Sequence, residues 1–92
     1  MTILMTSDLP GVDAAGYQHL VDQLGDVLTS TEGFLAHAAG PTDTGWRVVE
    51  LWTSEEAHRA WFDAHVVPTM PPGAPLPSIA IQPVTNTLVP IT

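Results

Sequence analysis

The 92-residue sequence contains no cysteine and no lysine, and its positive side chains are two arginines. Without cysteine the chain can form no disulfide, no thiolate nucleophile and no sulfur-ligated metal site, which fits a reducing compartment. Ten acidic residues outweigh the arginines and give a formal net charge of -8 at pH 7. Such a chain repels phosphate backbones and anionic lipid surfaces. We therefore expect neither a nucleic-acid partner nor a membrane partner.

A long hydrophobic run is also missing. Residues 1–11 lack a basic segment followed by an apolar one, so we expect no signal peptide, no membrane span and a cytoplasmic location. The chain is nevertheless apolar for its size, with 45% hydrophobic residues and a mean hydropathy of +0.18. A domain this short buries only around two-thirds of the surface that its unfolded form exposes. We expect one domain, residues 1–92, with part of its apolar surface covered by a second copy.

The stretch from Gly45 to Phe62 changes from a strand period to a helical period. Side chains alternate across a strand, so one face carries two tryptophans around a carboxylate. Ser54 then has the character of an N-cap, and two glutamates follow in the first turn, where the helix dipole favours negative charge. The residues expected on that strand face are Trp46, Val48, Glu50 and Trp52.

The remaining patterns predict the order β-α-β-β-α-β. This order indicates an α+β, ferredoxin-like fold, with an antiparallel sheet carrying two helices on one face. The other face then lacks a cover, which favours a homodimer. The expected elements are a strand over Thr2–Ser7 ended by the turn signature Asp8–Gly11, a helix over Asp13–Ser30, a strand over Phe34–Ala39, a hairpin loop over Gly40–Gly45, a helix from Ser54 to about His65 stopped by Pro68, a proline-rich spacer, and an edge strand over Ile79–Leu88 that contains Pro83.

Glu50 is the first candidate for chemistry. A carboxylate between aromatic rings loses hydration, which raises its pKa and suits a general acid or base near neutral pH. The alternatives are a rim position or an ion pair with another residue. We predict that Glu50 contacts His58 or His37, or that its pKa is raised.

The second predicted helix carries a histidine candidate. His58, Trp61, Phe62 and His65 follow i, i+3, i+4 and i+7, one stripe that can face the sheet. The imidazole of His58 can exchange protons near neutral pH, or it can be a core-edge group bonded to backbone or water. His65 can instead stabilise the end of the helix dipole.

A metal site is not expected. His58 and His65 are seven residues apart on a helix, about 10 Å along its axis, which is too far to share one ion. His37 lies on the second strand, where the register decides whether it joins a pocket or the dimer face. His19 is expected in solvent, opposite the apolar stripe of the first helix.

Three motifs resemble those of the antibiotic-biosynthesis-monooxygenase (ABM) superfamily of small dimeric α/β-barrel proteins. They are Glu32-Gly33-Phe34-Leu35, the strand-to-helix segment from Glu50 to Ala57, and Gln82-Pro83-Val84-Thr85-Asn86. The resemblance covers nearly the whole chain and implies a dimeric α/β barrel. It also implies that Trp52 faces the pocket between sheet and helices.

The same resemblance implies a range of activities, among them cofactor-free oxygenation, heme degradation and polyketide cyclisation. The heme-ligating histidine of the heme-degrading branch falls at Phe62 of this chain, so we expect no heme and no other cofactor. The polar residues of the oxygenases are also changed, to Val48 and His58.

We expect a small cofactor-independent enzyme of secondary metabolism that acts on an aromatic or polyketide-like substrate, and an ABM-type monooxygenase first. A polyketide cyclase of the same fold and a non-catalytic small-molecule-binding dimer are the alternatives. Glu50 or His58 would be the base, and Arg47 or Arg59 an anion stabiliser if one turns inward. Arg59 has a simpler role as an i, i+4 partner of Glu55. The expected substrate-binding residues are Trp52, Trp61, Phe62, His37, His65 and Trp46.

Overall fold

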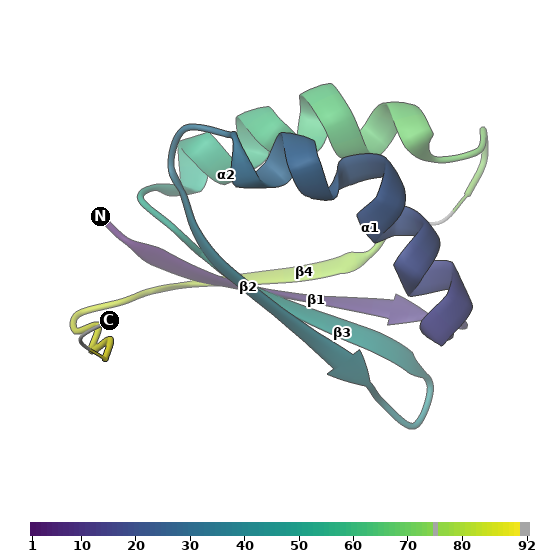
Figure 1. Cartoon of the computed structure of the whole chain (residues 1–92), viewed down its shortest axis with the longest axis horizontal. Helices are drawn as coiled ribbons and strands as arrows, with labels where there is room; N and C mark the ends of the chain where they lie inside the picture. The colour runs from purple at the N-terminus through teal and green to yellow at the C-terminus, as the bar shows by residue number, and fades with distance from the viewer. Residues whose placement is uncertain (75, 91–92) are drawn as a thin grey trace.

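The computed structural model describes residues 1–74 and 76–90, which form a four-stranded antiparallel sheet with two helices across one of its faces (Figure 1). The strand order is β2-β3-β1-β4, the ferredoxin-like α+β arrangement expected from the sequence. In chain order the elements are β1 (Ile3–Pro10), α1 (Ala14–Thr29), β2 (Phe34–Pro41), β3 (Gly45–Trp52), α2 (Glu55–Trp61), a π-helical turn η1 (Phe62–Val66), a 3-10 turn η2 (Val67–Thr69) and β4 (Ser78–Pro83).

The central strands β1 and β3 are longer than their local signals predict. The turn signature at residues 8–11 does not end β1 at Ser7, because β3 supplies antiparallel partners as far as Pro10, which pairs with Gly45. The chain then turns at Gly11, whose φ of 78° is favourable for glycine. On β2 the strand likewise extends past Ala39 to Pro41, so the hairpin loop is shorter than expected. Long-range pairing outweighs the local turn preference at both places.

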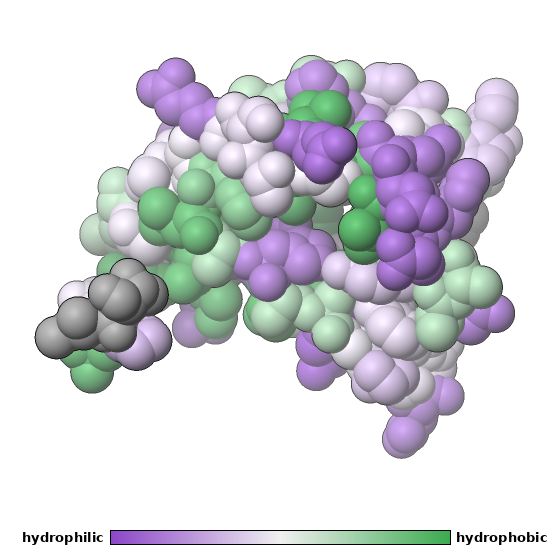
Figure 2. Space-filling model, viewed as in Figure 1, coloured by the Kyte–Doolittle hydropathy of each residue, from purple (hydrophilic) through white to green (hydrophobic). Residues whose placement is uncertain are grey.

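Helix α1 follows its sequence pattern closely. The side chain of Asp13 caps the helix by accepting a hydrogen bond from the Gly16 N–H at 2.8 Å. The apolar stripe turns toward the sheet and buries Leu28, while His19 is exposed on the opposite side, as predicted. Hydrophilic residues gather over α1 on the right of the molecular surface (Figure 2).

A β-bulge in β2 decides which side chains of this strand face the helices. Phe34 pairs with Trp52, but the register shifts between Phe34 and Ala36, and His37 then pairs with Glu50. Residues directly opposite each other share a face, so the inserted residue turns both Phe34 and His37 toward the helices. Strict alternation would have placed these two residues on opposite faces, because they are three apart.

The second helical segment begins where predicted, because the Ser54 hydroxyl caps α2 by accepting from the Ala57 N–H. It does not stop before Pro68. After Trp61 it widens into η1 and continues through η2 to Thr69, with Pro68 inside the 3-10 turn. A π-helical turn has the effect of inserting one residue into the helix. Side chains beyond Phe62 are therefore rotated relative to the predicted stripe.

The sheet has two different faces. Its helix-facing side contributes most of the core, whose buried apolar members are Ile3, Met5, Leu28, Val48, Trp52 and Trp61. The opposite side is bare in Figure 1. Strand β4 is an edge strand that ends at Pro83 rather than at Leu88, in keeping with a proline that cannot donate to a sheet ladder. No helix among residues 1–74 and 76–90 is long and apolar enough to cross a membrane.

Candidate functional site

The site is built on the helix-facing side of β3. Alternation along this strand places Glu50 beside Trp52, and both are deeply buried, with 3% of Glu50 and none of Trp52 exposed. The indole Nε1–H of Trp52 donates to Oε1 of Glu50 at 2.9 Å. A carboxylate at this depth needs such donors to compensate for its lost hydration.

The second carboxylate oxygen of Glu50 contacts His37, which the bulge in β2 brings to the same side. Oε2 lies 2.7 Å from Nδ1 of the imidazole. The prediction that Glu50 contacts His37 or His58 is confirmed for His37. The carboxylate is therefore held on both oxygens, by one residue of its own strand and one of the neighbouring strand.

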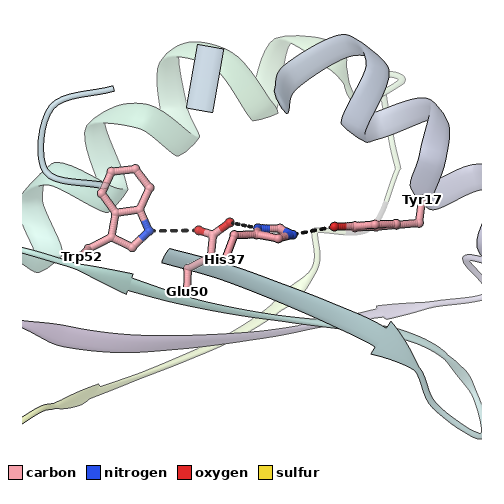
Figure 3. A network of polar contacts seen from close by, with 4 residues as sticks. All are labelled: Tyr17, His37, Glu50 and Trp52. Carbon is pink, nitrogen blue, oxygen red and sulfur yellow. Dashed lines mark hydrogen bonds and ion pairs between the residues drawn. The ribbon is translucent and has the colours of Figure 1, made fainter. Parts of the chain in front are cut away.

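The chain of contacts continues from His37 to helix α1. Nε2 of the imidazole lies 2.6 Å from the hydroxyl of Tyr17. Figure 3 shows Trp52, Glu50, His37 and Tyr17 in a row between the sheet and the helices. The row joins β3, β2 and α1, so three elements must pack correctly before it forms.

The proton positions in this row follow from what each group can donate. A carboxylate only accepts hydrogen bonds, so Nδ1 of His37 carries the shared proton and donates to Glu50. In the neutral ring Nε2 is then an acceptor, and the Tyr17 hydroxyl donates to it. Burial, and to a smaller extent the charge of Glu50, raises the pKa of Tyr17 above its usual 10.0. Tyr17 is thus a neutral phenol at pH 7.

Helix α2 contributes a second histidine from the other side. His58 is 3% exposed, and its Nε2 has no hydrogen-bond partner among the described residues. Aromatic rings surround it, with centroids 5.6 Å away for Trp52 and 6.0 Å away for Phe62. Burial lowers the pKa of His58 below 6.5, against a smaller opposing effect of Glu50. His58 is therefore a neutral imidazole with an unused nitrogen.

A cavity of about 280 Å³ lies between the helices and the sheet. This volume is slightly below the roughly 300–1,000 Å³ typical of ligand pockets. Its polar side chains are Ser7, Tyr17, Thr29, His37, Glu50 and His58, and the rest of its wall is apolar, including Met5, Leu20, Leu24, Leu28, Phe34, Val48, Trp61, Phe62 and Val66.

The predicted aromatic walls are placed differently from one another. Trp61 and Phe62 line the cavity, but Trp52 does not, because its ring is fully enclosed and its polar edge points to Glu50. Trp46 is also outside the lining and stacks on Tyr17, with ring centroids 5.3 Å apart. The expectation that Trp52 forms a wall is wrong, because the indole fills the core beneath the cavity.

His65 does not join the site. It is exposed, and Val66 lines the cavity in its place. The π-helical turn explains the difference, because the inserted residue moves the sheet-facing position from i+7 to i+8 of His58.

Neither arginine turns toward the cavity. Arg47 makes a two-pronged contact with Asp8 on the other face of the sheet, at 2.6 and 3.0 Å, and its hydrogen bond lowers the pKa of Asp8. Arg59 pairs with Glu55 one helical turn away at 2.7 Å, as predicted. The suggestion that an arginine stabilises an anion in the site is therefore wrong for both.

Three polar lining residues were missed by reasoning from the sequence. Tyr17 and Thr29 lie within the helix predicted over Asp13–Ser30, Ser7 ends the strand predicted over Thr2–Ser7, and none of the three was a candidate. The sequence contains a signal for a polar contact at Tyr17, because a tyrosine on a buried helix face usually finds a hydrogen-bond partner for its hydroxyl. Among the described residues, no group of three or more histidine or acidic side chains is arranged to hold a metal ion.

No protein-family model matches the sequence, and no curated protein matches it. Among solved structures, the chain is similar to that of the heme-degrader MhuD from Mycobacterium tuberculosis, which has two hemes bound in its active site. The TM-score is 0.55 and the sequence identity 19%, and the match covers 96% of this chain and 99% of that chain. The chain has the fold of this protein. An arginine-to-serine variant of MhuD with two manganese protoporphyrin IX bound per active site gives a TM-score of 0.55 and 19% identity, over 96% of this chain and 98% of that chain. The likeness confirms the ferredoxin-like α+β fold of the chain.

Proposed function

We propose that this protein is a cofactor-independent enzyme that removes a proton from an aromatic or polyketide-like substrate bound in the cavity. The observation that carries the proposal is the buried carboxylate of Glu50, held by Trp52 and His37 at the wall of an apolar cavity. A carboxylate bonded to one imidazole nitrogen orients the ring and stabilises the imidazolium that forms when the ring accepts a proton. In a site with few other polar groups this electrostatic stabilisation is strong.

The substrate anion has two productive fates. In a monooxygenation, the deprotonated carbon reacts with O₂, and a CH₂ group becomes a carbonyl while the second oxygen atom leaves as water. In a cyclisation, the carbanion attacks a carbonyl of the same molecule and needs no oxidant. The ABM-like fold favours the monooxygenase. Both reactions start with the same proton transfer.

The unused Nε2 of His58 is suited to hold a polar group of the substrate. A buried nitrogen without a partner costs free energy that a ligand hydrogen bond would recover. Trp61, another residue of the cavity wall, has an Nε1 that likewise lacks a partner within residues 1–74 and 76–90. We therefore expect a mostly apolar ligand with at least one oxygen near His58.

The side chains around the cavity do not suit heme. A heme carries two negatively charged propionates, and the described lining contains no arginine or lysine to pair with them. Both arginines are bound to carboxylates elsewhere, and Glu50 would add repulsion. His58 has the nitrogen of an axial ligand, but this single feature does not outweigh the charge mismatch. The residues around the cavity therefore do not fit heme.

We further propose that the protein acts as a homodimer joined through the bare sheet face. The side chains on this face alternate with those that point to the helices, and they are largely apolar along the centre of the sheet. A second copy would cover them, which accounts for the high hydropathy of a short chain. The residues concerned are Leu4, Thr6, Ala36, Ala38, Val49, Leu51 and Ala80.

A non-catalytic binding dimer is the second candidate, and the mostly apolar cavity wall is the observation that favours it. The two candidates differ in whether bound ligand is deprotonated. Trp61 lies on the wall, so quenching of tryptophan fluorescence reports binding separately from turnover.

The test uses 5-nitrobenzisoxazole, an apolar bicyclic probe whose ring C–H is removed by a base while its N–O bond breaks, giving a coloured phenolate without an oxidant. The wild type should accelerate this elimination above buffer. Glu50→Gln should still quench fluorescence but lose about 10²- to 10⁴-fold in rate. Glu56→Gln, at an exposed position of α2, is the matched control and should keep the wild-type rate. Binding without any acceleration would refute the enzyme and support the binding dimer.

A further inference from the structure

The polar row ends at an atom that can meet a substrate, the hydroxyl oxygen of Tyr17. Both oxygens of Glu50 already accept hydrogen bonds, and both ring nitrogens of His37 are engaged. The single donor of Trp52 is used on Glu50. The hydroxyl of Tyr17 gives its proton to His37, but its oxygen keeps acceptor capacity on the cavity wall.

We propose that Tyr17 is the catalytic residue that takes the substrate proton, with His37 as the relay and Glu50 as the charge that stabilises the relay. This inference rests on the proposed function, and in it Glu50 is a positioning residue. The base suggested by the sequence, Glu50 or His58, is thereby replaced by a residue of α1.

The transfer balances as two linked proton movements. The substrate C–H or O–H proton moves to the Tyr17 oxygen as the original hydroxyl proton moves to Nε2 of His37. The substrate becomes an anion, the imidazole becomes an imidazolium bonded to the Glu50 carboxylate, and Tyr17 ends as a neutral phenol. The new O–H of Tyr17 then donates to the substrate anion.

The surroundings of Tyr17 support a linked transfer over a tyrosinate intermediate. Burial and the nearby carboxylate of Glu50 raise the pKa of Tyr17, which disfavours the phenolate. The ring stacks on Trp46, with centroids 5.3 Å apart, and lies nearly parallel to the His37 ring, with centroids 6.1 Å apart, each with an interplanar angle of 20°. Such packing fixes the direction of the hydroxyl, as a residue in contact with the reacting atom requires.

The experiment compares Tyr17→Phe with wild type on 5-nitrobenzisoxazole, with the probe carrying hydrogen or deuterium at the reacting carbon and in H₂O or D₂O. Phenylalanine keeps the stacked ring and removes only the hydroxyl. His37→Gln and Glu50→Gln test the rest of the row, and His19→Gln is the control at an exposed position of the same helix as Tyr17.

We expect Tyr17→Phe to lower kcat about 10²-fold with little change in KM. In wild type the substrate deuterium isotope effect and the solvent deuterium isotope effect should both be larger than one on the same step, because the C–H proton and the exchangeable Tyr17 proton move together. Tyr17→Phe should abolish the solvent isotope effect on the remaining rate and keep the substrate isotope effect.

The inference is overturned if Tyr17→Phe retains wild-type kcat while His37→Gln and Glu50→Gln lose it, since His37 would then take the proton directly. A wild-type solvent isotope effect of one beside a full substrate isotope effect overturns it as well. Both results leave the proposed function standing. If wild type itself shows no acceleration, the proposed function fails and the inference fails with it.

Discussion

The hydrogen bond from Trp52 to Glu50 gives a quantitative test of the buried carboxylate. Trp52→Phe removes the indole N–H and leaves Oε1 of Glu50 without this partner, in a side chain that is 2% exposed. A hydrogen bond to a charged group contributes about 1.5–3 kcal/mol to stability. Loss of ring volume in a fully buried position adds a cavity cost that has to be measured separately.

Trp61→Phe supplies this separate measurement. Trp61 is also buried, at 8% exposure, but its Nε1 has no hydrogen-bond partner among the described residues. Both substitutions remove the same atoms, and only Trp52→Phe also breaks a bond to a carboxylate. The difference between the two losses of unfolding free energy should therefore be about 1.5–3 kcal/mol. For a domain of this size it corresponds to roughly 6–24 °C in Tm.

The assay is urea unfolding followed by far-ultraviolet circular dichroism, which does not depend on the tryptophans being replaced. All variants are compared at one protein concentration, because dimerisation would make the apparent stability depend on it. In a Glu50→Leu background, Trp52→Phe should lower the unfolding free energy only as much as Trp61→Phe does. If the two substitutions lower the unfolding free energy equally when Glu50 is present, the reasoning is refuted, because the carboxylate would then not depend on Trp52.

Two further outcomes are expected. Burial lowers the pKa of His58, so the unfolded chain binds more protons than the folded one, and the unfolding free energy should fall as pH decreases from about 6.5 toward the folded-state pKa. His58→Leu should flatten this pH dependence in urea unfolding at pH 7.5 and 5. An unchanged pH dependence in this variant would contradict the assignment to His58. Val49 lies opposite Thr6 and Ala38 on the bare sheet face, and we expect it in the proposed dimer interface. Val49→Asp should therefore give a folded monomer in sedimentation, while the control Val27→Asp, at an exposed position of α1, should stay dimeric. A stable wild-type monomer at micromolar concentration would exclude the dimer.

The sequence by itself determined the features that depend on neighbouring residues. The alternation in Gly45–Trp52 placed Glu50 on the helix-facing side with Trp52, and Ser54 marked the start of α2. The stripe and cap of α1 located that helix to within a residue. These signals are local, because side-chain periodicity and capping need only the residues within one or two turns. The element order that followed was enough to predict the fold.

Only the tertiary structure decided how the site is assembled. A bulge in β2 turned His37 toward Glu50, and no local pattern predicts where a strand gains an extra residue against its partner. The π-helical turn after Trp61 removed His65 from the stripe. Tyr17 joined the row because α1 crosses β2 at the position where the bulge presents the imidazole. These contacts connect residues 13 and 20 positions apart, and their geometry is set by strand register and by helix packing on the sheet rather than by the residues next to them in the chain.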